Sequence, residues 1–136
     1  MKIKLTGVPE TLLITLRIRA FETQNPNGAI KDPYAVNILN QIEFSESDKD
    51  KVSKGSQTGT IARTIILDHI ITEFLSKNPQ GIIVNLGCGL DARCKRLPHK
   101  APLWFDIDVE ESIELRKHFF EENPGYHMIA KSMFDY

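Results

Sequence analysis

The sequence has little of what marks a secreted or membrane protein. Its 136 residues include only two cysteines, Cys88 and Cys94, and their spacing fits neither a disulfide framework nor a zinc site. No apolar run reaches the roughly 18 residues that would suggest a membrane span. Pro9, Glu10 and Arg17 interrupt any signal-peptide core near the N-terminus. We therefore expect free thiols and a cytoplasmic protein.

An excess of charge of one sign is also lacking. Seventeen basic and 18 acidic residues give a net charge of −1 at pH 7. This balance predicts no broad electrostatic attraction to nucleic acid or to an anionic membrane. The four histidines show no metal-ligand spacing, so no metal site is expected. The content of 41% hydrophobic and 26% charged residues is normal for a soluble globular protein.

The first half of the chain is predicted to be helical. Apolar periodicity indicates helices at 9–22, from Asp32-Pro33 onwards and at 59–77. The third helix would be capped by Thr58 or Thr60. Five of its apolar side chains would face a core: Ile61, Ile65, Ile66, Ile70 and Phe74. The polar stretch 45–58 before it is interpreted as a solvated loop, with a mobile cover over a ligand site as the alternative. Residues 1–78 are thus expected to form an N-terminal helical cap region.

From residue 79 the pattern changes to alternating strands and helices. Strands are expected at 81–86, 103–108 and 126–130, and helices at 91–97 and 109–122. The first strand is a nearly continuous apolar run, which is typical of a strand buried on both faces of a parallel sheet. The fold class is therefore α/β, and the chain stops soon after the third strand.

A glycine turn follows the first strand and carries the functional signal. Gly87 and Gly89 allow backbone N–H groups to approach a ligand closely. An acidic residue at the end of the next strand, about 20 positions on, can bind ribose hydroxyls. Asp106 and Asp108 lie 19 and 21 residues after Gly87 and point to the same face. We favour Asp108, because it is the last residue before the helix.

The turn by itself leaves the ligand open. Residues 87–92 also match the G-x-G-x-x-A form of dinucleotide sites, so an NAD-type module is one alternative, and a tight turn without a ligand is another. Asp91 favours a cationic ligand. In a dinucleotide site its carboxylate would lie near the pyrophosphate, and two like charges about 4 Å apart in a partly buried site cost several kcal/mol. S-adenosylmethionine is cationic at its sulfonium and ammonium groups. Arg63 could bind its carboxylate through a two-pronged hydrogen bond.

Several segments together resemble the leucine carboxyl methyltransferase family. They are Asp32-Pro33-Tyr34-Ala35, the helix with Arg63, residues 84–93 with the glycine turn, and residues 104–108. The resemblance runs from about residue 6 to the end. It implies a Rossmann-like class I methyltransferase fold, of which residues 79–136 would be the first half, cut after the third strand. It also implies S-adenosylmethionine as the cofactor.

The same resemblance implies roles for individual residues. Arg63 would hold the methionine carboxylate, and the glycine turn would line the methionine and ribose portion. Asp108 would accept from the ribose hydroxyls, and Ser132 and Met133 would meet the adenine ring. Many relatives carry an acidic residue at the position of Ser132. The full set of cofactor-site candidates is Arg63, Gly87, Cys88, Gly89, Asp106, Asp108, Ser132 and Met133.

The expected function follows from these roles. The chain would be the N-terminal, cofactor-binding portion of an O-methyltransferase that acts on a small molecule with a carboxylate or hydroxyl group. No convincing catalytic base is found in this stretch. The alternative is an inactive or assembly fragment of such an enzyme. The first strand would have an exposed apolar edge, which predicts self-association as a homo-oligomer.

Overall fold

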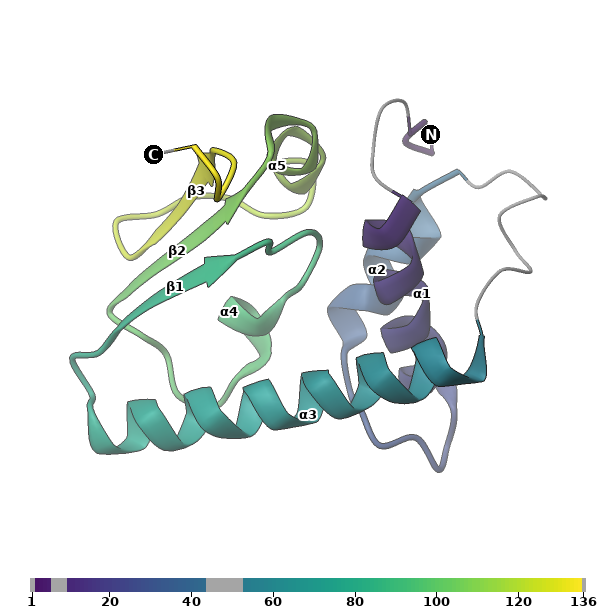
Figure 1. Ribbon diagram of the computed structural model, residues 1–136, viewed down its shortest axis with the longest axis horizontal. Coiled ribbons are helices and arrows are strands. Elements are labelled where there is room, and N and C mark those ends of the chain that lie inside the picture. The colour runs from purple at the N-terminus through teal and green to yellow at the C-terminus, as the bar shows by residue number, and fades with distance from the viewer. Residues whose placement is uncertain (1, 6–9, 44–52, 136) are drawn as a thin grey trace. The chain divides into compact units, whose positions relative to one another are not determined.

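The computed structural model describes residues 2–5, 10–43 and 53–135 of the chain (Figure 1). The chain divides into two compact units, Met1–Leu67 and Asp68–Tyr136. None of the helices within the described ranges is long and apolar enough to cross a membrane.

The first unit contains a pair of packed helices, α1 (Glu10–Gln24) and α2 (Pro33–Gln41). Asp32 caps α2 by accepting a hydrogen bond from the backbone N–H of Ala35 at 3.0 Å, which confirms the predicted start at Asp32-Pro33. Arg19 of α1 donates from Nε to the other carboxylate oxygen of Asp32 at 3.3 Å. The buried apolar side chains of the pair are Leu12, Leu16, Ile18, Ala20, Ala35 and Ile38.

The third helix, α3 (Lys54–Lys77), begins earlier than the sequence predicted. Thr58 and Thr60 lie inside it, so neither is its cap. The Ser53 hydroxyl instead accepts from the backbone N–H of Ser56 at 3.1 Å, as an N-cap does. The predicted apolar face was also wrong, because four of its members are between 41% and 57% exposed: Ile65, Ile66, Ile70 and Phe74. Thr64 and Leu75 are the buried side chains of this helix.

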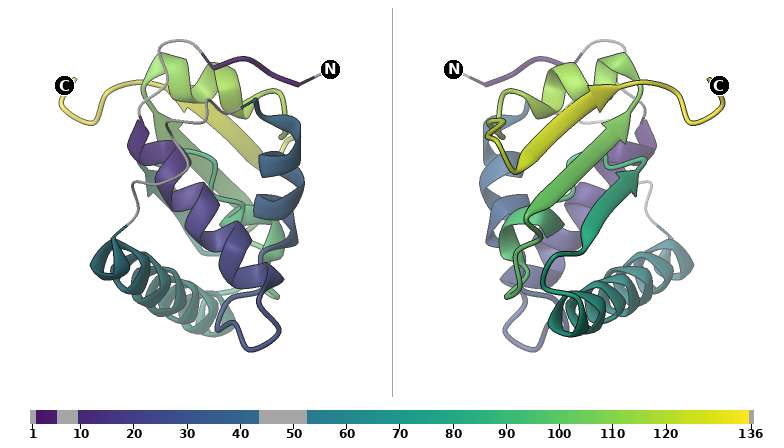
Figure 2. Two further views of the ribbon diagram at one scale, coloured as in Figure 1. Left: turned by 90° about the vertical axis from the view of Figure 1, so that its right-hand side faces the viewer. Right: turned by 90° about the vertical axis from the view of Figure 1, so that its left-hand side faces the viewer.

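The second unit is built on a three-stranded sheet of β1 (Ile82–Leu86), β2 (Leu103–Asp108) and β3 (Tyr126–Ala130). The strands lie in the order β1-β2-β3 and all neighbours are parallel, as the right-hand view of Figure 2 shows. The three predicted strands are confirmed. The connecting helices are shorter than predicted, at Arg93–Arg96 for α4 and Glu110–Arg116 for α5. Pro98 and the turn after Arg116 limit them.

The two faces of this sheet differ. Trp104, Asp106, Tyr126 and Met128 are buried on the face that α5 covers. On the other face, each of the outward side chains of β1 is more than half exposed: Ile82, Val84 and Leu86. The prediction that β1 is buried on both faces was therefore wrong. Right-handed connections between strands added in one direction place both helices on the same face, which explains the difference.

Candidate cofactor site

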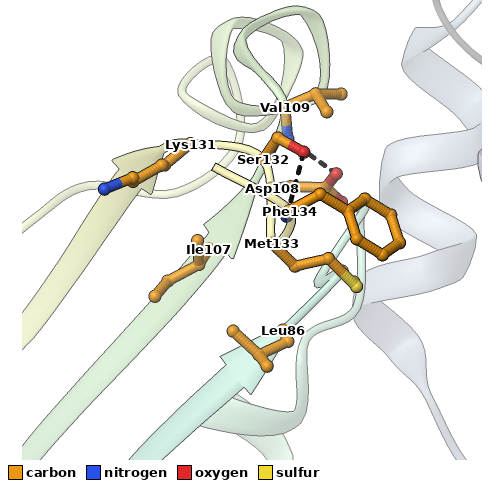
Figure 3. Close-up of a pocket in the computed structure, with 9 residues that line it drawn as sticks. Leu86, Ile107, Asp108, Val109, Lys131, Ser132, Met133 and Phe134 are labelled. Atoms are coloured by element: carbon orange, nitrogen blue, oxygen red, sulfur yellow. Dashed lines mark hydrogen bonds between the residues drawn. The ribbon is translucent and has the colours of Figure 1, made fainter. Parts of the chain in front are cut away.

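A pocket lies where the three strands of the second unit end (Figure 3). Its volume is about 120 Å³. Its walls come from the end of each strand or the segment that follows it: Leu86 and Gly87 at the end of β1, Ile107, Asp108 and Val109 at the end of β2, and Lys131, Ser132, Met133 and Phe134 after β3. Ligands of open α/β proteins bind at this edge of the sheet. Four of the sequence candidates, Gly87, Asp108, Ser132 and Met133, are thus brought together.

The glycine turn has a backbone conformation that favours glycine at two positions. Gly87 and Gly89 have φ angles of 67° and 48°, in the left-handed region that favours glycine. The N–H of Gly87 donates to the carbonyl of Ile107 at 2.8 Å, so the turn continues the pairing of β1 with β2. A Cβ atom added at Gly87 would meet only the Met133 Cε, at 3.9 Å. The open space beside Gly87 is therefore available to a ligand.

Asp108 is the acidic side chain of the pocket. Its Oδ2 accepts from the backbone N–H of Gly89 at 2.8 Å, and its Oδ1 accepts from the backbone N–H of Val109 at 2.8 Å. An ionised carboxylate has about four lone-pair positions, so two remain for hydroxyl donors. The two backbone contacts fix the orientation of the carboxylate before any ligand binds.

Asp106 has a different environment from Asp108, although the sequence made both candidates. It is fully buried and does not line the pocket. Its Oδ1 accepts from Asn85 Nδ2 and Trp104 Nε1, each at 2.9 Å. Its Oδ2 accepts from the Tyr126 hydroxyl at 2.6 Å and from Arg116 Nη2 at 2.5 Å. These bonds use its acceptor positions, so Asp106 organises the protein beneath the glycine turn.

Arg116 is a residue that the sequence reasoning missed. It ends α5 and is fully buried. Besides Asp106, its guanidinium donates to the Tyr126 hydroxyl at 3.0 Å and to the carbonyl of Gly89 at 3.0 Å. Burial alone would lower the pKa of Arg116, but Asp106 and the other ionisable neighbours together outweigh burial and raise that pKa, so the side chain stays charged. An arginine within the apolar stripe of a predicted helix was the available signal.

The negative charge of Asp91 is compensated by neighbouring arginines. Its Oδ2 accepts from Arg93 Nη1 at 2.9 Å, and its Oδ1 lies 3.6 Å from Arg96 Nη2. Arg93 and Arg96 also bind Asp68, which lies in the part of α3 that belongs to this unit. Arg93 therefore has a structural role. The argument that Asp91 would repel a pyrophosphate was wrong, because two guanidinium groups compensate its charge.

The surroundings of the two cysteines do not activate their thiols. Cys88 lies inside the glycine turn but is buried away from the pocket, and burial raises its pKa far above the ordinary range. Burial likewise raises the pKa of Cys94 to about 11. Both thiols are therefore protonated and unreactive near neutral pH. Cys88 acts as a small packing residue. Nor do the described residues contain a group of three or more metal-ligating side chains.

Arg63 belongs to the first unit and lies outside the pocket described above. It is an exposed residue of α3, nine positions after the helix begins. Its predicted role toward the cofactor remains a prediction.

A pocket at the ends of parallel strands, with a glycine turn and a carboxylate beside it, defines an α/β protein of the kind that binds nucleoside-containing ligands. The model of the leucine carboxyl methyltransferase family matches residues 13–127. The chain belongs to this family.

Two relatives of the chain are methyltransferases by their names. The chain is 36% identical, over 96% of its length, to the tetracenomycin polyketide synthesis O-methyltransferase of Streptomyces glaucescens. It is 35% identical, over 89% of its length, to an S-adenosyl-L-methionine-dependent methyltransferase of Gibberella zeae. It spans about half of each relative, 48% of the first and 44% of the second.

Proposed function

We propose that this chain is the cofactor-binding portion of an S-adenosylmethionine-dependent O-methyltransferase with a Rossmann-like class I fold. The observation that carries the proposal is the meeting of Gly87, Asp108, Ser132 and Met133 around one pocket. Family membership and the names of the two relatives support it. Residues 1–78 would serve as a helical cap region and residues 79–136 as the first half of the cofactor domain.

The residues of the pocket fit an adenosine-containing ligand. Asp108 has free acceptor positions for the two ribose hydroxyls, and the space beside Gly87 admits backbone contact with the sugar and the methionine portion. Met133, which is 53% exposed, offers an apolar surface for adenine, and the Ser132 hydroxyl offers a polar contact beside it. Arg63 would bind the methionine carboxylate through its fork of donors. When bound, S-adenosylmethionine supplies an electrophilic methyl group on a positively charged sulfur.

The protein has a limited chemical task in such a reaction. The leaving group is a neutral thioether, so no acid need protonate it. The side chains have to hold the acceptor in line with the methyl group and exclude water. A carboxylate acceptor is nucleophilic near neutral pH, whereas a hydroxyl acceptor requires a general base. We propose a small molecule with one of these two groups as the acceptor of the whole protein.

Calorimetric titration with S-adenosylhomocysteine tests the proposal. This product carries the same adenosine and amino acid groups as the cofactor. We expect saturable binding with a micromolar Kd for the chain of 136 residues. Absence of heat at high protein concentration, from protein that unfolds cooperatively, would favour the alternative of an assembly fragment without a cofactor site.

NADH is the matched control ligand. It also contains adenosine and ribose, but it adds a pyrophosphate. Because Arg93 and Arg96 compensate Asp91, charge at this residue does not by itself exclude NADH. Tighter binding of NADH than of S-adenosylhomocysteine, measured by nicotinamide fluorescence, would favour the oxidoreductase module and refute the proposal.

A further inference from the structure

We propose that Arg116 is a positioning residue that holds the backbone at Gly89 in the geometry the cofactor requires. The inference rests on the proposed function, since it assigns a role within the same site. Arg116 does not line the pocket and would not touch the ligand. It would act through the glycine turn.

The backbone N–H and the backbone carbonyl of Gly89 are each held by a side chain, from opposite sides. Its N–H donates to Asp108 Oδ2 at 2.8 Å, and its carbonyl accepts from Arg116 Nη1 at 3.0 Å. The first partner faces the pocket and the second lies beneath the turn. With φ at 48°, Gly89 is in a conformation that glycine leaves easily, because it has no Cβ to restrict it. The two bonds act on the two peptide groups that flank the Gly89 Cα, and together they restrict the backbone dihedral angles of Gly89.

Arg116 is itself rigidly held. Its guanidinium contacts the Asp106 carboxylate and the Tyr126 hydroxyl, and lies 4.1 Å from the centre of the Phe120 ring. A planar fork of donors can serve several acceptors at once, which a lysine ammonium on its flexible stem cannot do with the same geometry. The position of the Gly89 carbonyl is therefore set by side chains from β2, β3 and α5.

A gain in stability does not by itself explain why Arg116 and Asp106 form a buried ion pair. Apolar residues of similar volume often stabilise a protein as well as a buried ion pair does. The feature that an apolar replacement could not reproduce is the hydrogen bond to the Gly89 carbonyl. That bond is the direct link between the buried network and the turn that borders the pocket.

The test compares Arg116→Gln with Tyr126→Phe. Tyr126→Phe removes two hydrogen bonds from the same network, the one that Tyr126 donates to Asp106 and the one that it accepts from Arg116 Nε. It leaves in place both groups of the contact between Arg116 Nη1 and the Gly89 carbonyl. Affinity for S-adenosylhomocysteine is measured at a temperature at which thermal unfolding curves show each variant to be folded. We expect Arg116→Gln to weaken binding by about tenfold or more and Tyr126→Phe to change it less than about twofold, although both lower Tm. Arg116→Lys should restore part of the affinity.

A spectroscopic measurement separates positioning from general stability. Hydrogen exchange of the Gly89 amide, followed by NMR without any ligand, should be faster in Arg116→Gln and unchanged in Tyr126→Phe. A folded Arg116→Gln protein with wild-type affinity and wild-type Gly89 exchange would overturn the inference. If Arg116→Gln does not unfold cooperatively, Arg116→Lys is judged by the same two measurements. Failure of the wild-type chain to bind would refute the proposed function, while the exchange experiment would still decide the role of Arg116.

Discussion

The Asp108 carboxylate accepts the backbone N–H of Gly89 at 2.8 Å and thereby ties the end of β2 to the turn that follows β1. The same carboxylate also accepts from Val109. An acidic side chain that lines the pocket is thus oriented entirely by backbone donors. This arrangement makes the carboxylate a receptor for hydroxyl groups that does not need to reorganise on binding.

Replacement of Asp108 should weaken cofactor binding more than it weakens the fold. Asp108→Asn removes the charge and half of the acceptor capacity, so we expect about tenfold weaker binding of S-adenosylhomocysteine, or about 1.4 kcal/mol. Calorimetric titration measures the change. Glu110→Gln is the matched control, because Glu110 is an exposed acid two residues away and should leave affinity unchanged. Equal affinities of Asp108→Asn and the wild type would contradict the assigned role.

The two types of glycine in this chain should respond in opposite directions to alanine. Gly87→Ala places a Cβ on a residue with φ at 67°, which should destabilise the fold by about 1–2 kcal/mol and obstruct the pocket. Gly59 lies inside α3 with no atom within 4 Å of an added Cβ, so Gly59→Ala should stabilise by about 0.5–1 kcal/mol. Urea denaturation measures both. A neutral effect of Gly87→Ala would mean that the turn does not hold this conformation.

The buried thiols should make the fold sensitive to alkali. Burial raises the pKa of Cys94 from 9.0 to about 11, so its contribution to stability is complete below pH 9 and is lost as the pH rises toward 11. In this interval the unfolded chain releases a proton that the folded chain retains, and the free energy of unfolding should fall by up to about 1.4 kcal/mol per pH unit for each such group. The urea midpoint, measured from pH 8 upward, should decrease steadily. Cys94→Ala should flatten this dependence, and an identical slope in that variant would refute the assignment.

The exposed side of β1 should promote self-association. Within the described sheet, β1 is an edge strand, and its Ile82, Val84 and Leu86 side chains are each more than half exposed. An apolar edge of this kind pairs readily with another chain. Light scattering should show concentration-dependent association that Val84→Lys reduces, with Lys77→Glu on the exposed end of α3 as a control that leaves association intact. A wild-type chain that remains monomeric at all concentrations would refute the expectation.

The sequence was most informative where local chemistry is unambiguous. Two glycines after an apolar run, and an acid about 20 residues later, were sufficient to predict the turn, the parallel strands and the place of Asp108 at the end of β2. It was least informative for α3. Apolar residues occur around much of that helix, so periodicity could not identify the buried face, and the polar residues before Thr58 gave no sign that Ser53 would cap the helix.

By itself, therefore, the sequence determined the α/β order of the second unit and the residues available at the strand ends, because strand length, glycine turns and helix stops depend on neighbours in the chain. The order of residues already favoured Asp108 over Asp106, but only the tertiary structure showed what surrounds these two side chains, which share a face of β2. The donors that enclose Asp106 come from β1, β3 and α5 as well as β2. Contacts between residues so far apart in the chain depend on how the strands and α5 pack, and this packing also brought Arg116 to the Gly89 carbonyl.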